Sequence, residues 1–121
     1  MTNNAFLTAS HIKYLLALKK LNNSEGVKSA DVAKELDLTR PSIHNMMNTF
    51  LFMEYVKKEP GGRVFLTEHG IRKASFFEDY YRRIKEILFG GKKTDDTVDR
   101  AICAFLAELS EKSLQVLQER I

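Results

Sequence analysis

Residues Ser29–Phe50, SADVAKELDLTRPSIHNMMNTF, form the most informative stretch of this chain. They read as two short helices joined by a tight turn. Ser29 is suited to cap the first helix and Thr39 the second, because a hydroxyl oxygen accepts hydrogen bonds from the amides at a helix start. Asp37 lies at the turn, since aspartate tolerates a left-handed backbone. Pro41 falls in the first turn of the second helix, where its missing amide proton costs little. The stretch therefore predicts a helix-turn-helix.

The second helix, expected over Thr39–Met53, has an apolar and a polar face. Ile43, Met46, Met47 and Phe50 recur at helical spacing and are expected to point inward. The outward face is short, polar and nearly free of acids, which suits the major groove of DNA. The residues expected to contact DNA from this helix are Thr39, Arg40, Pro41, Ser42, His44, Asn45 and Asn48.

A short hairpin is expected directly after this helix. Val56 to Glu59 and Arg63 to Leu66 are β-prone runs on either side of a Pro-Gly-Gly turn. In this position a hairpin is the wing of a winged helix, and its basic residues Lys57, Lys58 and Arg63 can lie on DNA phosphates. The alternative is a solvated hairpin whose lysines keep an edge strand from pairing with other chains. The position after the helix-turn-helix favours the wing.

Helical periodicity continues on both sides of this region. A first helix is expected over residues 8–22, a long one from Thr67 to Phe89, and a last one that Thr94, Asp95 and Asp96 open and that runs towards the chain end. The last two each carry two apolar stripes, more than a thin helical pair can cover by itself. This surplus predicts a homodimer, with the alternative that the helices pack only on each other and on the first helix. The expected interface residues are Phe76, Tyr80, Leu106 and Leu117.

The predicted fold class is therefore mostly α with a small β hairpin. A winged helix-turn-helix DNA-binding domain is expected over residues 1–66, and a two-helix dimerisation region over residues 67–121. The length of 121 residues allows one domain, or one domain plus an extension, with a substantial core. The net charge of +3 is a weak argument for nucleic acid by itself. The basic excess nevertheless lies in residues 1–66, which hold nine Lys and Arg against six Asp and Glu.

Composition and motifs exclude several other classes. The single cysteine, Cys103, leaves no internal disulfide and fits a reducing cytoplasm. The start MTNNAFLTAS does not resemble a signal peptide, and no apolar run is long enough for a membrane span, so we expect a cytoplasmic protein. No nucleophile–base pair, phosphate loop or catalytic carboxylate pair is found, which argues against an enzyme. His11, His44 and His69 are scattered and are not expected to ligate a metal.

Three segments resemble the winged-helix part of the diphtheria-toxin-repressor and manganese-transport-regulator family of iron-dependent repressors. They are YLLALKKL over residues 14–21, SADVAKELDLTRPSIHNMM over 29–47, and VFLTEHG over 64–70. The resemblance covers about half of the chain. It implies a cytoplasmic homodimer that binds palindromic operators when Mn²⁺ or Fe²⁺ occupies sites between the first helix and the dimerisation helices.

The metal ligands that the resemblance implies are largely missing. They would be an acid or Met from the first helix, a His in the long helix, and a Glu-His pair preceded by Cys or Glu in the last. This chain has HIKYLL over residues 11–16, FFEDYY over 76–81 and CAFLA over 103–107, so only Cys103 matches. We therefore expect a regulator without a cofactor. The alternatives are a Mn- or Fe-responsive repressor with atypical ligands and a protein-interaction module that uses Phe52 and Met53. The candidate atypical ligands are Glu78, Asp79, Cys103 and Glu108.

Overall fold

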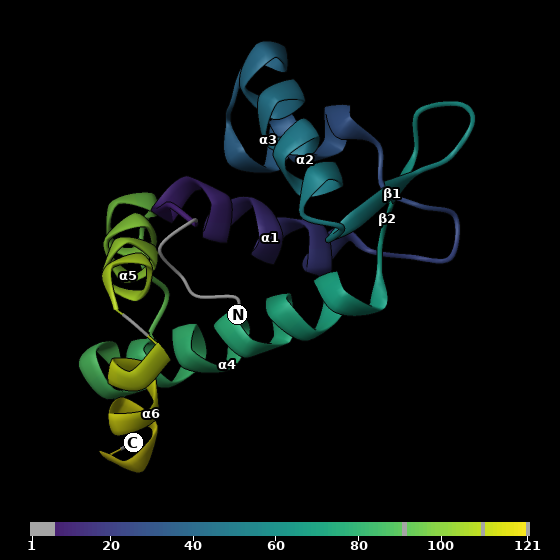
Figure 1. Cartoon of the computed structure of the whole chain (residues 1–121). Coiled ribbons are helices and arrows are strands. Elements are labelled where there is room, and N and C mark those ends of the chain that lie inside the picture. The colour runs from purple at the N-terminus through teal and green to yellow at the C-terminus, as the bar shows by residue number, and fades with distance from the viewer. Residues whose placement is uncertain (1–6, 91, 110, 121) are drawn as a thin grey trace. The chain divides into compact units, whose positions relative to one another are not determined.

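The computed structural model describes residues 7–90, 92–109 and 111–120. Within these ranges the chain forms six helices and a two-stranded antiparallel hairpin (Figure 1). The elements are α1 (Ala9–Leu21), α2 (Ser29–Leu36), α3 (Arg40–Phe52), β1 (Val56–Lys58), β2 (Val64–Leu66), α4 (Glu68–Phe89), α5 (Asp96–Glu108) and α6 (Glu111–Arg120). The predicted fold class, mostly α with a small β hairpin, is confirmed. No helix in the described ranges is long and apolar enough to cross a membrane.

The chain divides into two compact units, and the division runs inside two helices. Residues 14–75 form one, called here the helix-turn-helix unit, which contains α2, α3 and the hairpin. Residues 7–13 and the described residues from 76 onward form the other, called here the helical unit. Helices α1 and α4 each contribute residues to both. The sequence analysis divides the chain after residue 66 into a DNA-binding domain and a dimerisation region, and that functional division stays a prediction. The two units defined by packing instead meet after residues 13 and 75.

Local signals explain the geometry of the helix-turn-helix. Asp37 adopts a left-handed conformation with φ 53° and ψ 49°, as its place in the turn predicts. The Thr39 hydroxyl accepts a hydrogen bond from the Ser42 amide at 3.3 Å and caps α3, and Pro41 lies in the first turn. The predicted capping role of Ser29 is wrong. Lys28 occupies the cap position of α2 without a side-chain bond, and Ser29 is already helical.

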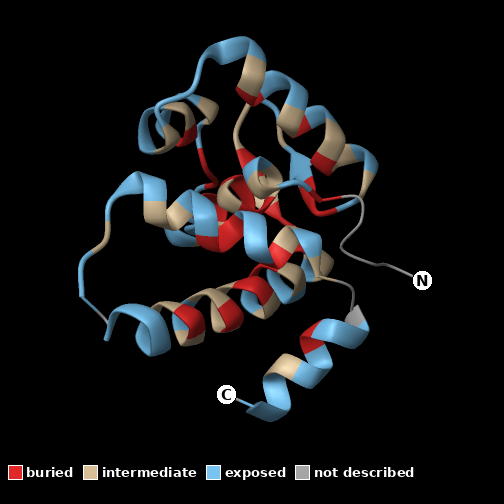
Figure 2. Cartoon of the chain, turned by 90° about the vertical axis from the view of Figure 1, so that its left-hand side faces the viewer, coloured by how far each residue is buried: buried red, intermediate tan, exposed pale blue. Residues whose placement is uncertain are grey.

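The core of the helix-turn-helix unit is built around Phe50 of α3. Its ring meets Tyr14 and Tyr55 edge-on, at centroid distances of 4.9 and 5.5 Å. Tyr55 in turn lies against the His69 ring at 4.8 Å. Figure 2 shows the helices with buried residues along one side and exposed residues along the other. This arrangement fixes which face of α3 is left for a partner.

The hairpin pairs Val56 with Leu66 and Lys58 with Val64. Its turn contains Gly61 and Gly62 at φ 92° and 86°, a backbone region that favours glycine. Val27 adds an isolated bridge to β2, with two backbone hydrogen bonds of 2.8 and 2.9 Å to Val64. The sequence indicated only a break in this region, so the added bridge was missed.

The end of the helical unit differs from the expectation of one last helix. Asp95 caps α5 by accepting a hydrogen bond from the Val98 amide at 3.0 Å. Leu109 then takes an extended backbone, with φ −86° and ψ 136°, and separates α5 from α6. The Tyr80 hydroxyl donates to the Leu114 carbonyl at 2.9 Å and so joins α4 to α6. The apolar periodicity ran through the break because side chains on both helices are buried.

Replacing Tyr14 by Phe is expected to leave the free energy of unfolding unchanged or to raise it. The hydroxyls of Tyr14 and Tyr55 are buried, and neither has a hydrogen-bond partner in the described part of the chain. Burial raises the pKa of Tyr14 to about 12. An unsatisfied buried hydroxyl costs about 1–3 kcal/mol, so its removal should do no harm. Urea denaturation followed by circular dichroism measures the change.

Tyr14→Ala serves as the control and should lose about 3–5 kcal/mol, because it also removes the ring. A similarly large loss for Tyr14→Phe would show that the hydroxyl is bonded.

Candidate nucleic-acid interface

Helix α3 presents a polar face opposite the one that it buries. Ile43, Met47 and Phe50 are buried, whereas Met46 is half-buried. The exposed residues recur three, four and seven positions apart and so share one side of the helix. These exposed residues are Arg40, Pro41, His44, Asn45, Asn48 and Phe52. Ser42, which was predicted to contact DNA, and the polar residue Thr49 are half-buried beside this face.

The polar residues of α3 divide into two groups by their hydrogen bonds. Thr39 and Ser42 bind each other through their hydroxyls at 3.0 Å, so both serve the helix start. Arg40, His44, Asn45 and Asn48 have side chains without a hydrogen bond or ion pair in the described part of the chain. Their donors and acceptors are therefore available to a partner. Arginine and asparagine are the residues that make two hydrogen bonds to guanine and adenine edges, respectively.

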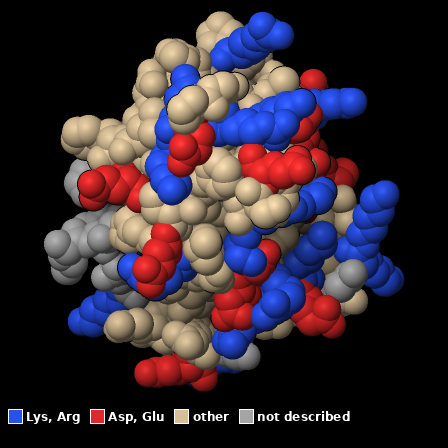
Figure 3. Space-filling view, turned by 90° about the vertical axis from the view of Figure 1, so that its right-hand side faces the viewer, with Lys and Arg blue, Asp and Glu red and all other residues tan. Residues whose placement is uncertain are grey.

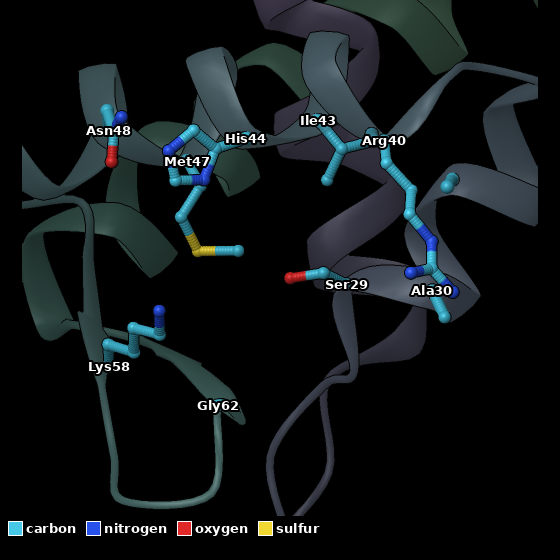
Figure 4. A pocket seen from close by; sticks show the side chains of 10 residues that line it. Ser29, Ala30, Arg40, Ile43, His44, Met47, Asn48, Lys58 and Gly62 are labelled. Carbon is cyan, nitrogen blue, oxygen red and sulfur yellow. The ribbon is translucent and has the colours of Figure 1, made fainter.

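The three basic residues of the hairpin are not equivalent. Lys57 pairs with Glu59 at 3.4 Å and lies over the Phe65 ring at 5.9 Å. Arg63 is half-buried and donates to the Gly26 carbonyl at 3.2 Å, so it also holds the loop before α2. Lys58 is exposed and unpaired among the described residues. Successive residues of a strand point to opposite faces, and Lys58 takes the face towards α3 (Figure 4).

A groove of about 350 Å³ lies between α2, α3 and the hairpin (Figure 4). Buried Ile43 and Met47 belong to its apolar part, and the Met47 thioether extends into it. Ser29 at the start of α2 faces the opening from one side, and the Lys58 ammonium approaches from the other. The groove adjoins the polar face of α3 and shares residues with it.

Surface charge is mixed rather than of one sign. On the side of the molecule that Figure 3 shows, Lys and Arg side chains alternate with Asp and Glu. The net charge of the chain is only +3. A charge balance this even gives only weak long-range attraction for a polyanion.

Within the helical unit, Lys13 occupies the region of α1 where the resemblance implies a metal ligand. Its ammonium lies 2.5 Å from Asp96 Oδ1, and Arg100 contacts the other oxygen of that carboxylate at 2.6 Å. These two hydrogen bonds, the one from Lys13 first, lower the pKa of Asp96. An ammonium repels a cation and already satisfies the carboxylate. A divalent ion does not fit this arrangement.

The neighbouring polar groups of the helical unit are also engaged. Asp99 accepts hydrogen bonds from the hydroxyls of Tyr81 at 2.5 Å and Thr94 at 2.7 Å. Burial raises the pKa of the Cys103 thiol to about 12, so the free thiol is protonated at neutral pH. In the described ranges no group of three His, Cys, Asp or Glu side chains is placed to hold an ion.

The apolar surface of the helical unit lies away from two of the predicted interface residues. Tyr80 is 4% exposed and Leu106 is fully buried within the single chain, which argues against a direct interface role for either. Phe76 and Leu117 are half-buried. Ile87 and Leu88 on α4 are 59% and 66% exposed. Leu88 lines a shallow apolar groove of about 270 Å³ whose other lining residues are Ile84, Phe89, Val98, Ala101, Ile102 and Phe105.

Comparison with known proteins supports the fold. No protein-family model and no curated protein matches the sequence. A hypothetical protein from Sulfolobus solfataricus matches with a TM-score of 0.69 and 23% identity, over 94% of this chain and 88% of that one. T. acidophilum IdeR, an iron-dependent repressor, matches with a TM-score of 0.59 and 21% identity. That match covers 88% of this chain and 52% of IdeR, so this chain spans about half of its length. The expected resemblance therefore holds at the level of a winged-helix, IdeR-like fold.

Proposed function

We propose that this protein is a sequence-specific DNA-binding transcription regulator and not an enzyme. It acts in the cytoplasm as a homodimer on an inverted-repeat operator and needs no metal. The observation that carries the proposal is the face of α3, where Arg40, Asn45 and Asn48 are exposed and unpaired within the described chain. Their chemistry matches base edges in the major groove, and Lys58 adds a cation from the hairpin. The IdeR-like fold supports the same reading.

Selection of bound fragments from genomic DNA tests this proposal. Purified protein is incubated with sheared genomic DNA, with a chelator in one arm and added Mn²⁺ in the other, and retained fragments are sequenced. An inverted repeat is expected in both arms, with half-site centres about 10 base pairs or a multiple apart, because two recognition helices then meet successive major grooves. Retained fragments without a common motif would overturn sequence specificity.

Dimer formation is expected to use the exposed apolar surface of the helical unit. Leu88 and Phe105 line its apolar groove, and both are largely exposed in the single chain. Apolar patches of this kind on a small chain favour self-association. Sedimentation at low micromolar concentration should give twice the chain mass of 13.9 kDa.

The double variant Leu88→Lys/Phe105→Lys should give the monomer mass. Phe52→Lys, at an exposed aromatic residue of α3, is the control and should stay dimeric. A monomeric parent protein would refute the dimer.

Operator affinity is expected to change less than about threefold, under 1 kcal/mol, when Mn²⁺, Fe²⁺ or Zn²⁺ is added at micromolar concentration. Asp96 is already paired with Lys13 and Arg100, and Asp99 accepts a hydrogen bond from the Tyr81 hydroxyl. The negative charge of these carboxylates is therefore stabilised without a bound ion. A ligand shifts a conformational equilibrium only by its differential affinity for the two states. Titration calorimetry with each ion, beside operator binding in chelator, measures both quantities. A tenfold or larger gain with one ion would support the alternative of atypical ligands.

The protein-interaction module remains the second candidate because Phe52 is 88% exposed on the polar side of α3. Met53, the second residue expected to contact a partner protein, is half-buried at the end of the helix. One exposed aromatic ring is common on protein surfaces, and protein interfaces favour a larger apolar centre. The polar neighbours Asn45 and Asn48 therefore favour DNA.

A further inference from the structure

The groove between α2, α3 and the hairpin combines an apolar interior with a cationic rim. Ile43 and Met47 are 2% and 5% exposed and belong to the interior. Arg40, His44 and Lys58 are exposed at the rim, and none of the described residues that line the groove is acidic. The volume of about 350 Å³ lies within the usual range for a small-molecule site, roughly 300–1,000 Å³.

These features specify the chemistry of an occupant. An anionic group beside Met47 would be attracted to Lys58, which has no competing ion pair among the described residues, while Arg40 adds a second cation at the other end of the groove. An apolar body would cover the Met47 thioether and the Ile43 side chain. Methionine adapts its shape to a ligand and favours contact with aromatic rings. A carboxylate carried on an aromatic or branched aliphatic body satisfies both requirements.

We propose that this groove binds a small amphipathic carboxylate, and that the bound ligand competes with DNA for α3. Competition rests on the proposed function, because Arg40 and His44 belong both to the groove and to the exposed face of α3. A ligand anion neutralises Lys58, and the ligand body stands beside the side chains of α3 that would contact DNA. The ligand therefore lowers the affinity for DNA and releases the operator.

A DNA strand is a poorer occupant than a small carboxylate. A strand along this face presents phosphates and sugars, which the exposed cations can bind without an apolar recess. The apolar interior made by Ile43 and Met47 contributes binding energy only to a ligand with an apolar body. The alternative to be tested is therefore that the groove binds phosphate as tightly as it binds an amphipathic carboxylate.

Methyl NMR of methionine-labelled protein tests the proposal at a single residue. The probe is 2-naphthoate, with 2-naphthalenemethanol as the neutral analogue and inorganic phosphate as the bare anion. The Met47 methyl resonance should move saturably with naphthoate, whereas Met46 and Met53, which do not line the groove, should move little. The neutral analogue and phosphate should each bind at least about fivefold more weakly, the loss expected for one charged hydrogen bond or for the apolar contact.

Two adjacent lysines provide matched variants. Lys58→Ala should weaken naphthoate binding at least about fivefold. Lys57→Ala should leave it unchanged, because Lys57 pairs with Glu59 and does not line the groove. Ala30→Phe fills the opening from the exposed side of α2 and should abolish the Met47 shift without unfolding the protein. Equal shifts of Met46, Met47 and Met53, or no effect of Lys58→Ala, would overturn the site.

DNA binding is measured separately, so the two proposals fail in distinguishable ways. Naphthoate should raise the apparent Kd for a selected duplex in step with occupancy of the groove. Phosphate binding as tight as naphthoate binding would identify a seat for the DNA backbone and overturn the ligand site. A filled groove with unchanged DNA affinity would overturn competition. A saturable Met47 shift in a protein that binds no DNA would leave the site intact and refute the proposed function.

Discussion

Gly70→Ala is expected to lower the free energy of unfolding by at least about 3 kcal/mol, the upper end of the cost of overpacking. A Cβ at this position would lie 2.0 Å from the Tyr55 carbonyl oxygen and 3.1 Å from Leu66 Cδ2. That carbonyl also accepts the Thr67 amide at 3.0 Å, so the backbone is held on both sides of the contact. Alanine can enter this position only if the start of α4 moves away from Tyr55.

Urea denaturation of Gly70→Ala measures this loss. Ser75→Ala, at an exposed position of the same helix, is the control and should be neutral or slightly stabilising because alanine favours helix. A Gly70→Ala protein as stable as the parent would show that the close approach of α4 to Tyr55 is wrong.

The double variant Arg40→Ala/Asn45→Ala is expected to lose about 2–6 kcal/mol of operator binding, since each base contact contributes about 1–3 kcal/mol. This corresponds to a loss in affinity of roughly 30-fold to 10⁴-fold. Both side chains are exposed and unpaired in the described chain, so the fold should be unaffected. Fluorescence anisotropy with the selected duplex measures the change.

A matched control removes the same residue types outside α3. Arg72 on α4 and Asn22 after α1 are both exposed, and among the described residues Arg72 pairs with its helical neighbour Glu68 at 2.9 Å. Arg72→Ala/Asn22→Ala should bind within about threefold of the parent, under 1 kcal/mol. If the α3 variant also stays within that range, α3 is not the reading helix.

Local sequence signals predicted the helix-turn-helix well because their effects are local. Asp37, Thr39 and Pro41 each act through their own backbone or an amide three residues away. The segment VFLTEHG over residues 64–70 also contains a local contact, because the Thr67 hydroxyl accepts a hydrogen bond from the Gly70 amide at 3.0 Å. The same hydroxyl donates to the Glu54 carbonyl at 2.6 Å, a tertiary contact between residues thirteen positions apart.

Properties that depend on packing were less accessible to sequence. Tyr80 and Ile87 are seven residues apart and so fall on one side of α4, but only the structure shows that Tyr80 is buried and Ile87 exposed. The Lys13–Asp96 ion pair joins residues 83 positions apart, so no short motif reports it. The groove beside α3 likewise needs three elements to form. The predicted DNA-contacting residues and the homodimer stay predictions.

Whether α3 reads DNA sequence is tested by comparing the affinity of the protein for its selected inverted repeat with its affinity for a scrambled duplex of the same composition. Anisotropy titrations of both duplexes across several salt concentrations, in chelator, separate base-specific binding from phosphate binding. We expect at least about 10³-fold tighter binding to the selected duplex. We also expect Arg40→Ala/Asn45→Ala to remove most of this preference while keeping the salt dependence. Equal affinity of the parent protein for the two duplexes would contradict the claim that α3 reads DNA sequence.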